Sequence, residues 1–181
     1  PVGNVDTIAI CFYPYGFANF VNTPLETLVD KETPIAELFG QSEASELEQQ
    51  ITIATNTEQR IEIIEKFLLK KLNEESTISN IVKSTVDILI RTNGSTSINI
   101  ILKDDLSKRR QLERHFKKQI GISPKQLGKA IRLQATLQKL LNQKSEKLTD
   151  IAYENEYFDQ NHFIRDFKEL VGITPKQFSE N

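Results

Sequence analysis

The sequence GITPKQF at residues 172–178 repeats, with small changes, the sequence GISPKQL at residues 121–127. The two copies lie 51 residues apart, and the alignment of residues 111–129 with residues 162–180 needs no gap. Of these 19 positions, 8 are identical, and several others keep an apolar residue. We therefore infer that one structural unit occurs twice, which is too few copies for a solenoid.

Each copy predicts the end of one helix and the start of another. Gly121 and Gly172 suit the left-handed backbone conformation in which helices commonly end. Ser123–Pro124 and Thr174–Pro175 pair a hydroxyl N-cap with a proline at the first helical position, which is typical of a helix start. Apolar residues at helical spacing before each glycine predict a buried face, formed by Leu112, Phe116 and Ile120 in the first copy and by Phe163, Phe167 and Leu170 in the second.

A shorter helix is predicted upstream of each of these helices. The sequences are INIILKDD at residues 98–105 and LTDIAYEN at residues 148–155, and we expect Asp159 to cap the helix that follows the second. A helix, a tight turn and a second helix form a helix-turn-helix motif. The repeat therefore predicts two such motifs in one chain.

The segment between the copies predicts one long connecting helix. Residues 124–142 have leucine and isoleucine at helical spacing and contain 19 residues, which gives a length of about 28 Å. Successive major-groove faces on one side of B-DNA lie about 34 Å apart. A helix of this length could hold two DNA-reading helices at a similar spacing.

The charge is distributed unevenly, although the net charge is only −2. Residues 1–102 hold 7 Lys and Arg against 14 Asp and Glu, whereas residues 103–147 hold 13 against 4 and residues 148–181 hold 3 against 7. This asymmetry indicates a local basic surface around the first copy and the connecting helix. A solvated charged face is the alternative interpretation.

The N-terminal half predicts one strand followed by helices. Residues 5–13, VDTIAICFY, are rich in β-branched and aromatic residues and predict a strand. Helical patterns follow at residues 33–40, 42–55, 57–73, 78–94 and 97–106, with the best candidate for a boundary between domains at residues 94–97. The fold class is therefore mainly α, with a tandem helix-turn-helix domain preceded by a smaller helical segment and a short β remnant.

Residues 97–179 resemble the C-terminal DNA-binding domain of AraC/XylS-type transcriptional regulators. The sequences that carry the resemblance are RRQLERHFKKQIGISPKQLGKAIRLQ and LTDIAYENEYFDQNHFIRDFKELVGITPKQF. The resemblance implies seven helices with two helix-turn-helix motifs and a linker helix, and the sequence-specific binding of double-stranded DNA. It also implies contact with RNA polymerase as a partner.

The N-terminal half is similar to the end of a sensor domain that precedes this DNA-binding unit in some members of the family. The matching sequences are CFYPYGFANFVNTPLETLVDKETPIAELFG and RIEIIEKFLLKKL. We accordingly assign residues 1–94 to the end of a regulatory region and residues 95–181 to the DNA-binding domain. We expect the chain to be a piece of a longer protein, with a small-molecule effector bound by the missing sensor portion and a homodimer formed through the N-terminal region.

Two positions depart from the family pattern. Lys108 stands where a hydroxyl residue usually opens the first recognition helix, so two alternatives are open: the start of this helix shifts, or Lys108 contacts phosphate. Glu156 stands where the turn of the second motif usually has glycine. These departures, with the acidic second motif, motivate an alternative function: a helical protein-interaction module that keeps the fold but has lost strong DNA binding.

Placed on the sequence by this resemblance, the recognition helices cover about residues 108–119 and 160–170. Arginine, glutamate and amide side chains can read base edges, whereas lysine more often contacts phosphate. The residues expected to contact bases are Arg110, Glu113, Arg114, Gln160, Asn161, His162 and Arg165. The residues expected to contact phosphates are Lys108, Lys117, Lys125, Lys168 and Lys176.

Each assignment has a structural alternative. Arg114 and Arg165 could form ordinary ion pairs with acidic neighbours, and Glu113 could simply order a nearby arginine. The repetition of the two arginines at equivalent positions favours DNA contact.

The sequence predicts no enzyme, metal site or cofactor. His115 and His162 occupy non-equivalent positions in the repeat and Cys11 is far from both, so no metal-ligand spacing occurs. No phosphate-binding loop or nucleophile motif is present. A single cysteine and the lack of a signal-like start or a membrane-length apolar run lead us to expect a cytoplasmic protein.

Overall fold

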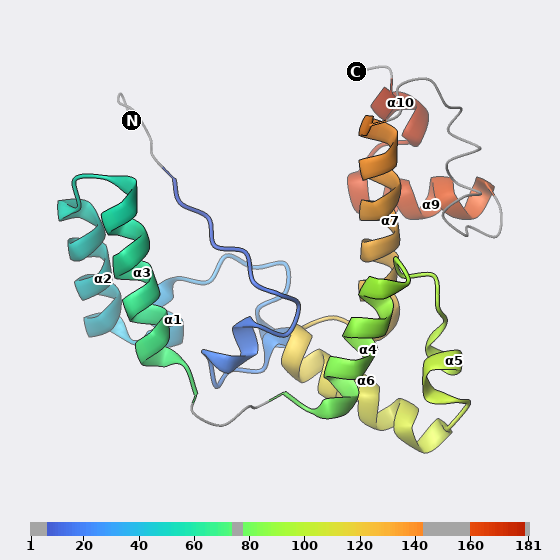
Figure 1. The fold of residues 1–181 in the computed structure, drawn as a ribbon, viewed down its shortest axis with the longest axis horizontal. Helices are drawn as coiled ribbons and strands as arrows, with labels where there is room; N and C mark the ends of the chain where they lie inside the picture. Colours follow the sequence, from blue (N-terminus) through green and yellow to red (C-terminus); the bar gives the residue numbers. More distant parts are fainter. Residues whose placement is uncertain (1–6, 74–77, 143–159, 180–181) are drawn as a thin grey trace. The chain divides into compact units, whose positions relative to one another are not determined.

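The computed structural model describes residues 7–73, 78–142 and 160–179, without the side chains of residues 139–142, 160, 162 and 179. The chain divides into two compact units, each built from two segments. Unit 1 comprises Pro1–Ser79 with Lys118–Gly121, and unit 2 comprises Asn80–Lys117 with Ile122–Asn181. The described residues are mainly helical, as the sequence predicts (Figure 1).

Unit 1 contains short helices and one helical hairpin. Its elements are η1 (Phe17–Asn19), η2 (Leu25–Thr27), α1 (Ile35–Phe39), α2 (Gln41–Ile53) and α3 (Thr57–Lys71). The helices α2 and α3 run side by side (Figure 1). The rings of Phe39 and Phe67 pack edge to face with their centroids 5.2 Å apart, and the Lys71 ammonium lies over both rings and pairs with Glu43.

The strand predicted at residues 5–13 is wrong for the part that the structure describes. Residues 7–13 adopt no regular secondary structure. A strand is stable only when its backbone pairs with a neighbouring strand, and the described residues form no such partner. A composition rich in β-branched and aromatic residues is therefore not sufficient to predict a strand.

Unit 2 is built around the long helix α7 (Pro124–Asn142). Its other elements are α4 (Asn80–Arg91), α5 (Ile98–Leu102), most of α6 (Leu106–Ile120), α9 (Gln160–Val171) and α10 (Pro175–Ser179). The predicted connecting helix over residues 124–142 is confirmed with the same limits. The predicted helix at residues 148–155 and the cap at Asp159 lie outside the described residues.

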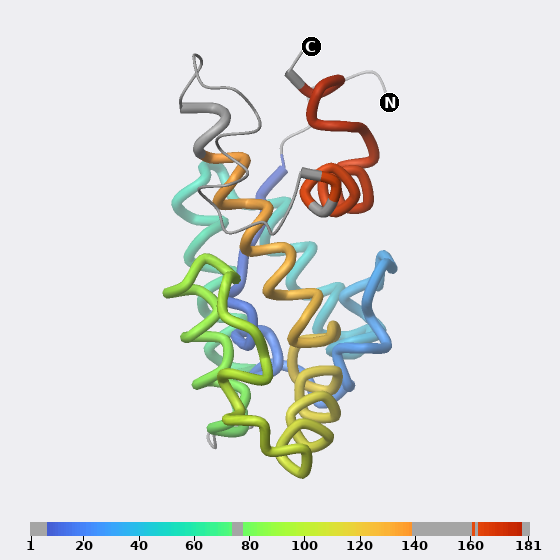
Figure 2. The backbone as a smooth tube through the Cα atoms, turned by 90° about the vertical axis from the view of Figure 1, so that its right-hand side faces the viewer, coloured from blue at the N-terminus to red at the C-terminus, as the bar shows by residue number. Residues whose placement is uncertain are grey.

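The helix α7 packs against α4 and against α9. The helix α4 packs on α7, and the loop after α4 approaches the backbone of α7 closely, because a Cβ atom on Gly94 would lie 2.1 Å from the carbonyl oxygen of Gly128. At the middle of α7, Leu133 forms a buried cluster with Phe163 and Phe167 of α9. Figures 1 and 2 show that α9 lies across α7 rather than along it.

The turns of the two repeats have matching geometry. Gly121 and Gly172 have φ angles of 93° and 86°, so both adopt the left-handed conformation predicted for them. After the first glycine, the amide of Gln126 donates to the Ser123 hydroxyl (3.2 Å), and the Ser123 amide donates to the Gln126 side chain (2.9 Å). The same reciprocal bonds join Thr174 and Gln177. This capping box confirms the predicted helix starts.

Candidate nucleic-acid interface

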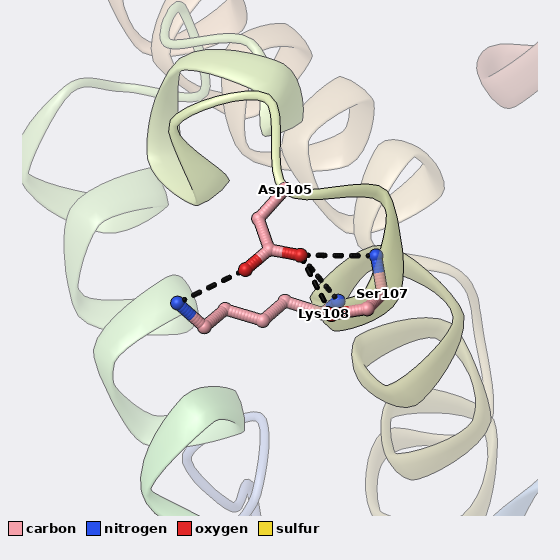
Figure 3. Close-up of polar contacts among 3 residues, drawn as sticks. All are labelled: Asp105, Ser107 and Lys108. Atoms are coloured by element: carbon pink, nitrogen blue, oxygen red, sulfur yellow. Dashed lines mark hydrogen bonds and ion pairs between the residues drawn. The ribbon is translucent and has the colours of Figure 1, made fainter.

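The helix α6 begins with a carboxylate cap. The amide (3.0 Å) and hydroxyl (2.7 Å) of Ser107 and the amide of Lys108 (3.2 Å) all donate to one carboxylate oxygen of Asp105 (Figure 3). These bonds satisfy amides that have no acceptor within the helix. The Ser107 hydroxyl and the Lys108 amide lower the pKa of Asp105 from 3.8 to about 2.

The cap moves the start of α6 toward the N-terminus. The helix begins at Leu106, two residues before the start expected from the resemblance. The physical reason is that Asp105 supplies the acceptor that the usual hydroxyl residue would supply at position 108. Lys108 is then free of the capping role, and its ammonium forms an ion pair with Asp105 at 3.2 Å.

Burial of one face of α6 decides which side chains point outward. Leu112 and Phe116 are fully buried, as predicted. Arg110, Glu113 and Arg114 are exposed on the remaining surface. A helix with one apolar stripe and a basic outer face is suited to lie in the major groove.

Glu113 has an ion-pair partner on its own helix. Its carboxylate lies 3.6 Å from Nε of Arg109, one turn earlier. Arg109 also donates from Nη1 to the side chain of Asn99 (3.1 Å). The structural alternative for Glu113, the ordering of a neighbouring arginine, is therefore realised with Arg109.

The helix α9 has a similar arrangement, but the prediction that Leu170 lies on its buried face is wrong, because Leu170 stands in the last turn of the helix and is 46% exposed. Phe163 and Phe167 are 2% and 0% exposed, and Asn161 and Arg165 are exposed. The rings of the two phenylalanines contact each other edge to face at 5.6 Å. The side chains of Gln160 and His162 lie outside the described set, so their predicted roles stay predictions.

A three-residue ionic cluster joins α7 to α9. The Lys129 ammonium lies 3.1 Å from a carboxylate oxygen of the buried Asp166 and 2.7 Å from one of Glu169. The hydrogen bond from Lys129 lowers the pKa of Glu169. Burial acts to lower the pKa of Lys129, but the bonds to Glu169 and Asp166 outweigh it and raise that pKa. The cluster therefore holds α9 in one orientation on α7.

The lysines predicted to contact phosphates are all exposed. Lys117 and Lys168 lie on α6 and α9 at equivalent positions of the repeat, and Lys125 and Lys176 lie in the first turns of α7 and α10. The structure thus brings the predicted site residues of each repeat onto a helix and the turn that follows it. In Figure 1, α6 and α9 run in the same general direction. The helix α6 leads into the N-terminal end of α7, and α9 crosses the C-terminal half of α7.

Sequence reasoning missed four residues that shape this surface. Asp105 could have been found, because an Asp directly before a helical pattern is a known N-cap signal. The equivalent glutamines Gln126 and Gln177 could have been found as the third residue after the hydroxyl in a capping box. Lys129 gives no signal in the sequence, because its two partners are 37 and 40 residues away.

Comparison with known proteins gives one match. Residues 107–181 match a family model described as a helix-turn-helix domain, which supports DNA binding and transcription regulation in general for this part of the chain. The match supports a helix-turn-helix domain of the AraC-like type, a DNA-binding class whose members are typically not enzymes. The match leaves residues 1–106 uncovered. No curated protein and no solved structure is significantly similar to the chain.

A search for membrane-spanning segments within the described ranges finds no helix that combines the length and the apolar character needed to cross a bilayer.

Proposed function

We propose that the protein is a sequence-specific transcription regulator that binds double-stranded DNA through two recognition helices, α6 and α9. The observation that carries this proposal is the equivalence of Arg114 and Arg165. Each is exposed, and each lies two residues before a fully buried phenylalanine that turns the same helix face inward. Since α7 separates the two helices, one chain can present two arginines to successive major-groove faces.

The proposed contacts fall into two groups. Base readout is assigned to Arg110, Glu113, Arg114, Gln160, Asn161, His162 and Arg165. Phosphate contact is assigned to Lys108, Lys117, Lys125, Lys168 and Lys176. Arginine can donate two parallel hydrogen bonds to guanine, whereas a lysine on phosphate adds affinity for every sequence.

The test begins with a preferred duplex, selected from a random pool, and follows its binding by fluorescence anisotropy. Arg114→Ala and Arg165→Ala should each cost about 1–3 kcal/mol on this duplex and much less on a scrambled one. The control is Arg91→Ala, since Arg91 is exposed at the end of α4, outside the proposed contacts. An equal loss for all three variants on both duplexes would contradict sequence-specific readout.

Salt dependence tests the phosphate contacts separately. Each lysine that neutralises one phosphate contributes about −0.9 to the slope of log K against log salt, so each Lys→Gln change should reduce the slope by about 1. Weak, salt-insensitive binding that is equal for all duplexes would favour a helical interaction module instead.

The remaining partners belong to the same proposal. Contact with RNA polymerase, an effector acting through a sensor portion, and a homodimer formed through the N-terminal region follow from the resemblance alone. The assignment of residues 1–94 and 95–181 to separate functional domains rests on the same resemblance and stays a prediction. The cytoplasmic location, expected from the single cysteine and the lack of a signal-like start or a membrane-length apolar run, also stays a prediction.

A further inference from the structure

Unit 2 contains a cleft whose lining includes only one of the proposed base contacts, Glu113. It has a volume of about 660 Å³ and lies between the loop of residues 94–99, the helix α6 and the first half of α7. This volume falls within the range of small-molecule sites, about 300–1,000 Å³. The cleft therefore has room for a ligand larger than a single ion.

The walls of the cleft are held in place before any ligand binds. The Gly94 carbonyl accepts two hydrogen bonds from the Arg132 guanidinium, from Nε (3.3 Å) and from Nη2 (2.6 Å). Gly94 has a φ angle of 72° and contacts Gly128 closely, so the loop lies directly on α7. A preformed site loses little conformational entropy when a ligand enters it.

The charged lining is strongly positive. Four cationic side chains, Arg109, Lys117, Lys125 and Arg132, face one carboxylate, Glu113. Arg109 is engaged with Asn99 and Glu113, and Arg132 with Gly94. Lys117 and Lys125 make no ion pair or hydrogen bond with any described side chain, so both ammonium groups are available to an anion.

The rest of the lining suits an organic body attached to that anion. The first turn of α7, Ser123 to Gln126, forms one wall, and helix starts favour negative charge. Among the apolar residues of the lining, Ile98 is partly exposed and offers apolar surface, whereas Leu89 and Pro124 are fully buried beneath the cleft. An inorganic ion would leave the Ile98 surface and most of the volume of the cleft without a partner.

We propose that the cleft binds a small organic phosphate, with Lys117 and Lys125 holding the phosphate group. Since the same two lysines are assigned to DNA phosphates above, the ligand should compete with DNA for them. The competition rests on the proposed function, whereas the binding of the ligand does not. A phosphate in the cleft can come from a small molecule or from the DNA backbone, and the experiment distinguishes the two sources.

The first arm uses the protein without DNA and measures the binding of phenyl phosphate by calorimetry at constant ionic strength. Saturable binding is expected, and Lys117→Gln or Lys125→Gln should weaken it by about tenfold. The repeat supplies matched controls: Lys168→Gln and Lys176→Gln remove the same charge at the equivalent positions, outside the cleft, and should leave this binding unchanged. Circular dichroism checks that each variant keeps its helix content.

Several outcomes of this arm would overturn the proposal. No binding of phenyl phosphate to the unaltered protein would do so, and so would an equal loss in the cleft variants and the control variants, because the latter indicates unspecific attraction. Inorganic phosphate serves as the comparison ligand. If it binds as tightly as phenyl phosphate, the organic part of the proposed ligand is wrong.

The second arm adds phenyl phosphate to the complex with the selected duplex. We expect the Kd for DNA to rise with the concentration of phenyl phosphate until the cleft is saturated. Lys117→Gln should remove this rise. Binding of phenyl phosphate without any change in the Kd would contradict competition. A protein that binds phenyl phosphate but no duplex would overturn the proposed function and leave the ligand site in place.

Discussion

At the scale of single residues, the start of α6 depends on one carboxylate. Asp105 accepts three hydrogen bonds from Ser107 and Lys108, which are stronger to its ionised form and therefore favour that form. Its pKa is about 2 in the folded protein, below its ordinary value of 3.8. A lowered pKa means that this contribution to stability is present above about pH 4 and is lost as the pH falls toward 2.

We therefore expect Asp105→Ala to lower the melting temperature at neutral pH and to reduce the loss of stability between about pH 4 and pH 2. Asp105→Asn is the matched control, because its amide oxygen can still cap the helix but does not titrate. Thermal unfolding monitored by circular dichroism at several pH values measures both effects. The same pH dependence in Asp105→Asn and in the unaltered protein would contradict this assignment.

A second residue-scale prediction concerns two glycines with similar backbone conformation but different surroundings. Gly94 and Gly172 have φ angles of 72° and 86°. A Cβ atom on Gly94 would lie 2.1 Å from the Gly128 carbonyl oxygen, whereas one on Gly172 would meet no atom within 4 Å. Gly172→Ala should therefore cost only the conformational term, about 1–2 kcal/mol.

Gly94→Ala should cost clearly more, because the loop must also move away from α7. Chemical denaturation of both variants gives the comparison. Equal losses of stability would show that the contact between the loop and α7 adds nothing to the conformational cost.

At the scale of elements, the orientation of α9 depends on both apolar and ionic contacts with α7. Phe163 and Phe167 pack with Leu133, and Lys129 pairs with Asp166 and Glu169. Apolar burial supplies most of the attraction but permits rotation, while the ion pairs require one register. Lys129 is thus a positioning residue for the proposed second recognition helix.

Lys129→Met should leave the buried Asp166 without this cation and loosen α9 on α7, while Lys129→Arg should largely restore the contact. Hydrogen exchange of the α9 amides measures the loosening. In the proposed function, Lys129→Met should also weaken binding to the selected duplex more than binding to a scrambled duplex, so that discrimination between the two falls. Unchanged exchange in α9 would show that the apolar cluster alone holds the helix.

The same cluster gives a pH dependence with two limits. The pKa of Glu169 is lowered, so its contribution is present above its ordinary pKa and is lost as the pH falls through the lowered value. The pKa of Lys129 is raised, so its contribution is lost only as the pH rises through that raised value. Exchange protection of α9 should therefore be constant around neutral pH.

At the scale of the whole molecule, the distribution of charge matters more than its sum. The chain carries a net charge of −2, yet residues 103–147 hold nine more cationic than acidic side chains. An acidic protein with a local basic surface is steered toward DNA in one orientation. The two proposed recognition helices belong to the same compact unit, so their separation is set by α7.

A fixed separation predicts a strict spacing in the DNA. Insertion of about five base pairs, half a helical turn, between the two contacted segments of the selected duplex should remove the contribution of one helix. Insertion of a full turn rotates the second segment back but moves it by about 34 Å, so it should not restore full affinity. Anisotropy titrations of the three duplexes measure this. Equal affinity for all three would mean that only one helix reads DNA.

The sequence by itself determined the repeat and the places where its helices end and begin. Gly, then Ser or Thr, then Pro ends one helix and begins the next, because only local backbone conformation and capping are involved, and the structure has these features at Gly121 and Gly172. The limits of α7 and the inward faces of Phe116 and Phe167 followed from helical periodicity in the same way.

The tertiary structure decided what depends on residues far apart in the chain. The strand expected at residues 5–13 needs a distant partner to pair with, and the described residues provide none. The ion pairs of Lys129 and the cleft beside Lys117 and Lys125 join segments that are separated by many residues. Such contacts form only when the chain has closed its loops, so no local pattern in the sequence records them.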